Sequence, residues 1–250
     1  MNQPESSLIA SSDIFIGGEW RAGRGTPYAS VYPADQSINA EITAASADDA
    51  RDAVEAADAA WRKPNWAGLK PHQRAAVLHR IADLINVRHE ALAQLQRRDN
   101  GKPISETRGL VTSAANTFRY FAACVETFEE SLTPSRGDFM TMSVHEPLGV
   151  VAAITPWNSP IASDAQKLAP ALAAGNAVVL KPAEVTPLAS LALARICEEA
   201  GVPAGVISVL PGKGSIVGDA LVRHPLVKKI AFTGGTEVGR GIARLAEAFA

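Results

Sequence analysis

The chain has 250 residues, a formal net charge of −2 at pH 7 and 20% charged residues. This length suits one large domain or two small ones with a sizeable core, and the small net charge argues against nucleic acid as a partner. No apolar run reaches the roughly 18 residues that a membrane span needs, so we expect no membrane partner. With two cysteines and no signal-peptide pattern, the sequence favours a reduced, cytoplasmic protein.

The two cysteines both lie in helical patterns, Cys124 in an aromatic run and Cys197 in an apolar one. Neither follows a strand or begins a helix, where a thiolate would be stabilised. We therefore expect two buried or half-buried structural thiols. We also expect no metal site.

The N-terminal part predicts a hairpin followed by helices. Residues 14–20 contain a Gly-Gly pair between short apolar runs, which is typical of a tight β-hairpin, and residues 29–33 are expected to pair nearby. Capping residues and apolar spacing then predict helices. These are residues 48–61 with Ser46 as cap, residues 71–87 starting at Pro71, a third helix stopped at Gly101, and residues 103–130. Residues 139–145 predict a further strand.

From Pro147 onward, strands and helices alternate regularly. The predicted strands are 149–154, 177–180, 205–210 and 227–232, and the predicted helices are 161–174, 187–200, 215–223 and 237 to the end. This order predicts an α/β fold with a Rossmann-like parallel sheet, helices on both its faces, and a helical N-terminal portion before it. The last helix has no stop signal, so we expect the natural chain to continue beyond Ala250.

Polar side chains follow the first two strands of this sheet. Ligands of open α/β sheets bind beyond the carboxyl ends of the strands. The amide of Asn158, after the first strand, can donate to a developing oxyanion, although a helix N-cap is an equally good explanation. Lys167, nine residues on, has the pattern of a solvated helix residue. Lys181 and Glu184, after the second strand, suit the hydroxyls of a ribose, and the alternative is a surface ion pair.

Two glycine-rich turns follow the later strands. Residues 232–240, FTGGTEVGR, join a strand to a helix whose free N–H groups suit a phosphate, unless the turn is a plain connection. Residues 211–218, PGKGSIVG, are not a G-x-G-x-x-G dinucleotide fingerprint. Neither turn is a G-x-x-x-x-G-K-[ST] loop, which disfavours nucleotide hydrolysis.

Four motifs in this order and at these intervals resemble the aldehyde dehydrogenase superfamily: TPWNSP, QKLAPALAAGN, LKPAE and FTGGTEVGR. The resemblance runs from residue 15 to residue 249 and covers the N-terminal, cofactor-binding half of the family. It implies a hairpin and helical portion at 1–134, a strand arm at 135–147 that reaches a neighbouring subunit, and a Rossmann-like NAD-binding portion at 148–250. It also implies a catalytic domain that this sequence does not contain.

The resemblance assigns roles to individual residues. Asn158 would be the oxyanion-hole amide, and Lys167 would lie near the inner end of the catalytic tunnel. The cofactor would meet Ile154, Thr155, Pro156 and Trp157 in its cleft, Lys181 and Glu184 at the adenosine ribose, Gly214 and Val238 at the adenine, and Phe232, Thr233, Gly234 and Gly235 at the pyrophosphate and nicotinamide. The chain departs from the family at Gly235, where serine is usual, and at Gln166, where an aromatic residue is common.

The implied function is the NAD-dependent oxidation of an aldehyde to a carboxylic acid, in a homodimer or homotetramer. A carboxylate at Glu184 favours NAD, and NADP stays possible. The nucleophilic cysteine and the ELGG general base of the family have no match in this sequence. Two alternatives are therefore a catalytically inert nucleotide-binding fragment and a subunit that serves assembly only.

Overall fold

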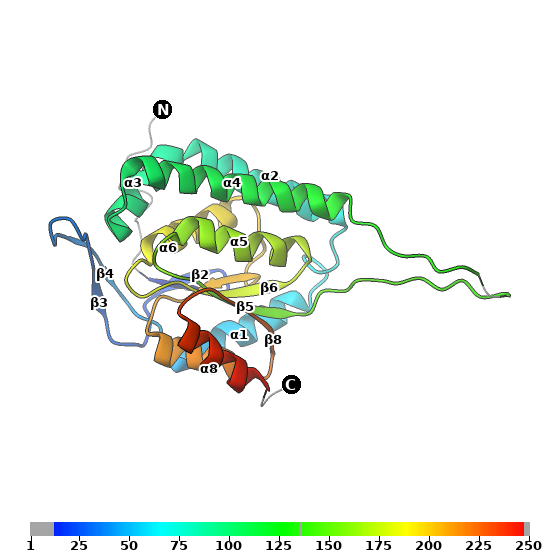
Figure 1. Ribbon diagram of the computed structural model, residues 1–250. Helices are drawn as coiled ribbons and strands as arrows, with labels where there is room; N and C mark the ends of the chain where they lie inside the picture. The colour runs from blue at the N-terminus through cyan, green and yellow to red at the C-terminus, as the bar shows by residue number, and fades with distance from the viewer. Residues whose placement is uncertain (1–12, 136, 248–250) are drawn as a thin grey trace.

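The computed structural model describes residues 13–135 and 137–247, and its centre is a six-stranded mixed sheet (Figure 1). The strands lie in the order β2-β1-β7-β6-β5-β8. Four of them are parallel: β5 (Val150–Ile154), β6 (Ala177–Lys181), β7 (Ile207–Val209) and β8 (Val227–Phe232). The predicted Rossmann-like sheet is thus confirmed, and the N-terminal hairpin of β1 (Ile14–Ile16) and β2 (Glu19–Arg21) extends it in antiparallel fashion.

The strand order places a topological switch point between β5 and β8. From β5 the chain moves outward through β6 and β7, and it then crosses back to add β8 on the other side of β5. Ile154 is in register with Lys181 on one side and with Phe232 on the other. The three strands therefore end level with one another, and the loops that follow them meet at one edge, where such sheets bind ligands.

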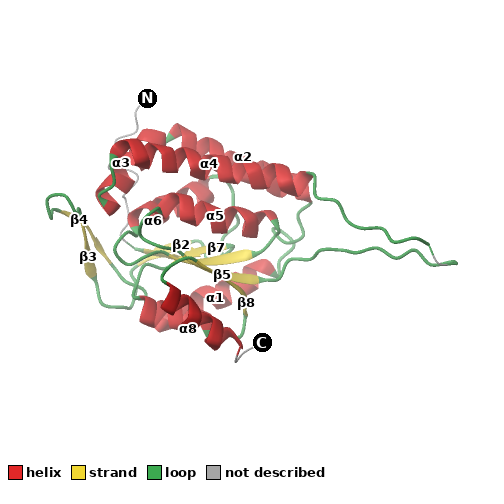
Figure 2. Ribbon diagram, viewed as in Figure 1, coloured by secondary structure: helices red, strands yellow, loops and turns green. Residues whose placement is uncertain are grey.

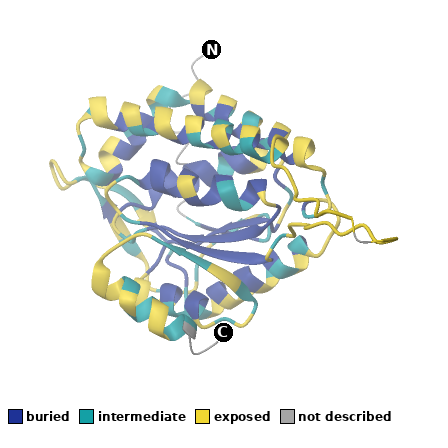
Figure 3. Cartoon of the chain, turned by 45° about the vertical axis from the view of Figure 1, so that its right-hand side comes forward, coloured by how far each residue is buried: buried dark blue, intermediate teal, exposed yellow. Residues whose placement is uncertain are grey.

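Helices form three layers around this sheet (Figures 1 and 2). The two helices α5 (Pro160–Ala173) and α6 (Leu188–Glu199) cover one face. An outer layer packs on them and consists of α2 (Pro71–Val87), α3 (His89–Asn100) and α4 (Ile104–Glu126). The opposite face is covered by α1 (Ala47–Trp61), α7 (Asp219–Val222) and α8 (Thr236–Glu247). Figure 3 shows that burial is greatest in the sheet and in the helices enclosed between layers.

Local signals in the sequence predicted most of these helices and strands correctly. Ser46 caps α1 in a capping box, because its hydroxyl accepts from Asp49 N at 3.1 Å and the Asp49 carboxylate accepts from Ser46 N at 2.8 Å. Gly101 ends α3 with φ of 75°. Gly17 and Gly18 form the hairpin turn at φ of 66° and 93°, and a Cβ at Gly18 would lie 2.5 Å from the Ala204 Cβ.

The pairing expected for residues 29–33 is confirmed, because β3 (Tyr28–Val31) pairs with β4 (Ile38–Ile42), a strand that was not predicted. Two predicted helices were wrong in part. The predicted helix 215–223 is a π-helical turn (Gly214–Gly218) followed by the short α7, because two glycines weaken its first turn. The helix predicted to 130 ends at Glu126, beyond which side chains lose contact with the core and Phe128 is 61% exposed. The last three residues of the predicted C-terminal helix lie outside the described residues.

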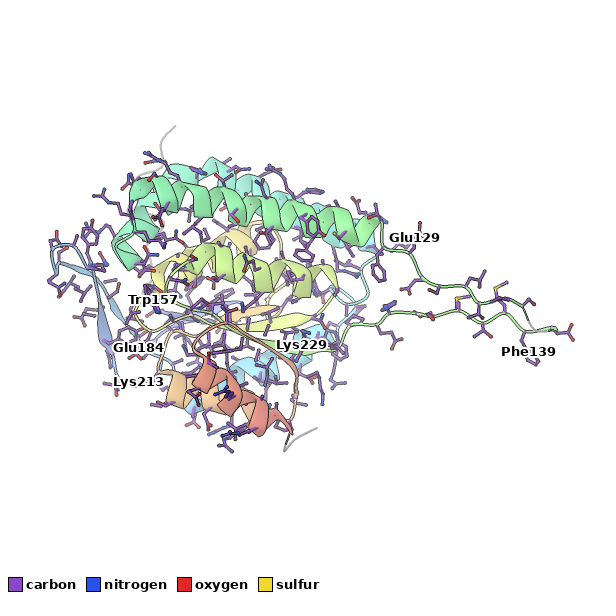
Figure 4. The ribbon with its side chains drawn as sticks, viewed as in Figure 1. Glu129, Phe139, Trp157, Glu184, Lys213 and Lys229 are labelled. Carbon is purple, nitrogen blue, oxygen red and sulfur yellow. The ribbon has the colours of Figure 1, made fainter. Side chains whose placement is uncertain are left out.

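Residues 139–145 do not form the predicted strand. They belong to an extended arm that leaves the domain after α4 and returns to β5, at the end of the sheet opposite the strand carboxyl ends (Figures 1 and 4). Among the described residues, its two limbs share the isolated bridge of Leu132 with Met142 and backbone bonds such as Ser143 N to Ser131 O at 2.9 Å. A two-stranded ribbon that pairs with no third strand and packs on no core is too weakly stabilised to keep a regular ladder of backbone hydrogen bonds.

Candidate active site and cofactor cleft

A cleft of about 430 Å³ lies at the switch point between the ends of β5 and β8. Ten of its lining residues were predicted from the sequence, and Ala183 is the one that was not. The lining consists of Ile154, Thr155, Pro156, Trp157, Asn158, Ala183, Phe232, Thr233, Gly234, Gly235 and Val238. The structure thus brings together two motifs that are more than 70 residues apart in the chain.

Asn158 stands at the mouth of this cleft with its side chain exposed. The residue that precedes α5 as its N-cap is Ser159, so the interpretation of Asn158 as a helix cap is wrong. Within the described residues, the Asn158 side-chain amide makes no hydrogen bond, while its backbone oxygen accepts from Asn100 Nδ2 at 3.4 Å. The amide N–H groups are therefore available to a ligand oxygen.

Lys167 lies on α5 beneath the cleft, and it is only 9% exposed. The expectation of a solvated residue from local pattern was wrong, because the side chain extends to the turn after β8 and not to solvent. The Lys167 ammonium group donates to the Thr233 hydroxyl at 2.6 Å. Burial lowers the pKa of Lys167, and the nearby Asp164 carboxylate acts in the opposite direction.

Asp164 is fully buried one helical turn before Lys167 and was missed in the sequence analysis. It accepts from the Ser190 hydroxyl of α6 at 2.5 Å. Burial raises the pKa of Asp164 to about 6, against the opposing effects of the Ser190 and Thr155 hydroxyls and of Lys167. The only sequence signal was a carboxylate among apolar residues on the inner face of a helix.

Lys181 and Glu184 lie on the loop after β6, next to the cleft. Lys181 is 4% exposed, and its ammonium group donates to Pro182 O. Burial lowers the pKa of Lys181 to about 8, and the Glu184 charge opposes this shift. The two side chains make no ion pair in the described part of the chain, so the alternative of a surface ion pair is wrong. Figure 4 shows Glu184 at the same end of the sheet as Trp157.

Gly214 does not line the cleft but begins the π-helical turn beside Lys181. A Cβ at Gly218, in the same turn, would lie 3.7 Å from Lys181 Cδ. Lys213, which precedes the turn, is exposed, and Figure 4 shows it at the same end of the sheet as Glu184. The turn therefore borders the Lys181 side of the site.

The glycine-rich turn after β8 leads directly into α8. Thr233 N donates to Ile154 O at 3.1 Å, which holds the turn against the end of β5. Gly235 O accepts the first helical bond from Gly239 N at 3.0 Å, so the N–H groups of the first turn of α8 have no helical partner. A Cβ at Gly235 would meet nothing within 4 Å, which leaves the backbone open to a ligand. Such a helix start suits a phosphate group.

The two cysteines lie away from the cleft. Cys197 is buried in α6, where burial raises the pKa of its thiol, and Cys124 is half-buried in α4. The expectation of two structural thiols is confirmed. Within the described residues there is no cluster of three or more potential metal ligands. In that same part of the chain, no helix combines the length and apolar character needed to cross a membrane.

Comparison with known proteins agrees with this geometry. The sequence profile of the aldehyde dehydrogenase family matches residues 20–249. Betaine aldehyde dehydrogenase from Staphylococcus aureus, solved in complex with NAD+, is 33% identical with a TM-score of 0.94, over 98% of this chain and 50% of that one. A variant of aldehyde dehydrogenase from Bacillus cereus is 34% identical with a TM-score of 0.95, over 100% of this chain and 52% of that one.

The chain thus spans about half the length of these solved structures. The match extends over nearly the whole sequence, and three of the four motifs on which the resemblance rests contribute residues to the cleft at the switch point. This chain belongs to the aldehyde dehydrogenase family.

Proposed function

We propose that this chain supplies the NAD-binding cleft and the oxyanion-stabilising amide of an enzyme that oxidises an aldehyde to a carboxylic acid. The observation that carries the proposal is the position of Asn158. Its side-chain amide, which has no hydrogen-bond partner within residues 13–135 and 137–247, shares one cleft with the glycine-rich turn and the start of α8. A hydrogen-bond donor and a phosphate-binding helix start thus face the same space.

The residues present fit a dinucleotide. The open backbone at Gly235 and the free N–H groups of α8 would hold the pyrophosphate. Lys181, with two N–H groups left after its bond to Pro182 O, and Glu184 would hold the adenosine ribose. Trp157 and Val238, 60% and 59% exposed, give the cleft apolar walls. Gly214 would border the adenine from its turn beside Lys181. When bound, NAD accepts a hydride from the substrate carbon.

The catalytic part of this chain is Asn158. Attack of a nucleophile on the aldehyde carbon places negative charge on the carbonyl oxygen, and the Asn158 amide would donate to that oxygen. Lys167 would support the reaction by holding Thr233 and its turn in place. Neither cysteine of this chain lines the cleft. The nucleophile and the general base would come from the other half of the protein, as the family resemblance implies.

The extended arm supports a homodimer or a homotetramer. Its limbs expose large apolar side chains, each between 57% and 78%: Leu132, Phe139, Met140, Met142 and Val144. Such a ribbon is stabilised only when another surface covers it. We expect a second copy of the protein to do so.

The two free thiols support a reducing compartment, which for this protein would be the cytoplasm.

The test combines NAD binding with turnover in the full-length protein. We expect the protein to bind NAD in calorimetric titration and to produce NADH from NAD and an aldehyde. Gly235→Leu should abolish NAD binding, because its side chain would fill the open backbone surface. Gly241→Leu is the matched control, because a Cβ there also meets open space but lies outside the cleft lining. NAD binding without turnover of any aldehyde would identify an inert nucleotide-binding protein, and absence of NAD binding would overturn the proposal.

A further inference from the structure

The last turn of α3 contacts the first turns of two helices that flank the cleft. Gln96, Asp99 and Asn100 occupy positions i, i+3 and i+4 of α3 and therefore share one face. Gln96 and Asp99 are 0% and 1% exposed. From the sequence, this segment was predicted only as the end of a helix at Gly101. In the structure, this turn supplies hydrogen bonds that α5 and α6 do not make for themselves.

The loop that carries Asn158 is bound by two of these residues. The N-cap of α5, Ser159, makes no side-chain capping bond. Instead, Gln96 Oε1 accepts from Ile161 N at 3.1 Å, and Asn100 Nδ2 donates to Asn158 O at 3.4 Å. The hydrogen bonds that hold the backbone on both sides of Ser159 thus come from side chains of α3 and not from a cap within the loop itself.

The third residue binds the start of α6, which directly follows the loop that carries Glu184. Pro187, the N-cap of α6, has no side chain that can cap the helix. Asp99 Oδ2 accepts from Leu188 N at 2.9 Å and from Ala189 N at 3.2 Å. Burial raises the pKa of Asp99 to about 8, while these two N–H groups act in the opposite direction. Whether the carboxyl group is charged or protonated, an oxygen remains to accept both bonds.

We propose that the last turn of α3 is the positioning element of this site. Asn100 and Gln96 fix the 155–160 loop that presents Asn158, and Asp99 fixes the 182–187 loop that presents Glu184. The assignment of what these loops contact rests on the proposed function. The physical reason is that free helix-start N–H groups need an acceptor, and a loop without its own cap follows the position of that acceptor. A shift of about 1 Å in such a loop is enough to reduce catalysis strongly.

Substitutions in the full-length protein can distinguish the effect of α3 on one loop from its effect on the other. Asn100→Ala should lower kcat about tenfold and leave the KM for NAD within about twofold, because of the two cleft loops it loosens only the one that carries Asn158. It also removes the bond from Lys102 N to Asn100 Oδ1 at 3.1 Å, which lies within the turn after α3. Asp99→Leu should raise the KM for NAD about tenfold with a smaller change in kcat, because it loosens the ribose loop. Asp99→Asn keeps an oxygen acceptor and should restore the wild-type KM. Arg97→Ala, exposed on the same turn, is the matched control.

Hydrogen exchange tests the positioning without reference to activity. In the full-length protein, Asn100→Ala should speed exchange within residues 157–161, and Asp99→Leu should speed it at Leu188 and Ala189, whereas Arg97→Ala should change neither. Equal losses in kcat and KM from both variants, or unchanged exchange at both loops, would overturn the proposal. If the wild-type protein oxidises no aldehyde, the proposed function fails, and the exchange data alone still decide whether α3 fixes these loops. Asn100 is only half-buried, so its variant remains informative if Asp99→Leu does not fold.

Discussion

The Lys167 ammonium group on α5 donates a hydrogen bond of 2.6 Å to the Thr233 hydroxyl in the turn after β8. This bond joins the helix that follows β5 to the turn that follows β8, across the switch point of the sheet. Lys167 is nearly buried, whereas Thr233 is exposed at the cleft. The lysine therefore fixes the position of the glycine-rich turn relative to α5.

We expect this bond to contribute to both stability and cofactor affinity. A double-mutant cycle of Lys167→Met and Thr233→Val should give a coupling of about 1–2 kcal/mol in the free energy of unfolding, as is typical of a hydrogen bond from a charged group. NAD affinity should fall in both single variants, because the turn is held less firmly. Lys229→Met, on the exposed side of β8, is the control (Figure 4). A coupling near zero in denaturant titrations would contradict the role of the bond.

If the proposed function holds, Asn158→Ala should lower kcat of the full-length protein by about 10²–10³, which is the usual effect of removing an oxyanion donor. The KM for NAD should change little, because the amide acts on the substrate oxygen. Steady-state kinetics with saturating NAD measures both constants. Asn65→Ala, an exposed asparagine outside the cleft, should have no effect. A near-normal kcat would mean that Asn158 does not face the reacting oxygen.

Glu184→Gln should raise kcat/KM for NADP relative to NAD. An ionised carboxylate accepts a hydrogen bond from a ribose 2′-hydroxyl but repels a 2′-phosphate, and solvent screening reduces this preference to roughly tenfold. Because Glu184 makes no ion pair with Lys181, its charge remains available to the cofactor. Lys181 attracts the phosphate, so we expect a preference for NAD and not exclusion of NADP. An unchanged ratio of the two kcat/KM values would show that Glu184 does not contact the ribose.

The stability of the fold should depend on pH through Asp164. Its pKa is raised to about 6 in the folded chain and is near 3.8 when the chain is unfolded, so the folded state binds more protons between these values. The free energy of unfolding therefore falls as pH rises from about 4 to about 6. A shift of about two units corresponds to roughly 3 kcal/mol.

Asp164→Asn removes this titration while keeping a side chain of the same size. Chemical denaturation at several pH values should show the wild type losing stability relative to the variant between about pH 4 and 6. Parallel curves for the two proteins across this range would contradict the raised pKa. Asp83→Asn, on the exposed surface of α2, controls for the general change in charge.

The sequence by itself determined the elements whose signals are local. Gly17-Gly18 predicted a tight hairpin because only such residues readily adopt two positive φ angles in succession. Ser46 predicted the start of α1 as its N-cap, and the capping box that it forms with Asp49 lies within four residues. The buried runs of β5 and β6 predicted parallel strands, and the motifs after them predicted most of the cleft lining.

The tertiary structure alone decided which of these residues meet and which are buried. Ile154 lies beside Phe232 only because β8 adds to the free side of β5, and strand order is not encoded in either strand. Lys167 is buried because its side chain reaches the turn after β8, which no pattern within α5 specifies. Asp99 caps a helix that begins 89 residues later. Such contacts depend on packing between layers of helices and strands. The residue pattern of one segment indicates its secondary-structure propensity and its apolar periodicity, but it does not indicate which other segment packs against it.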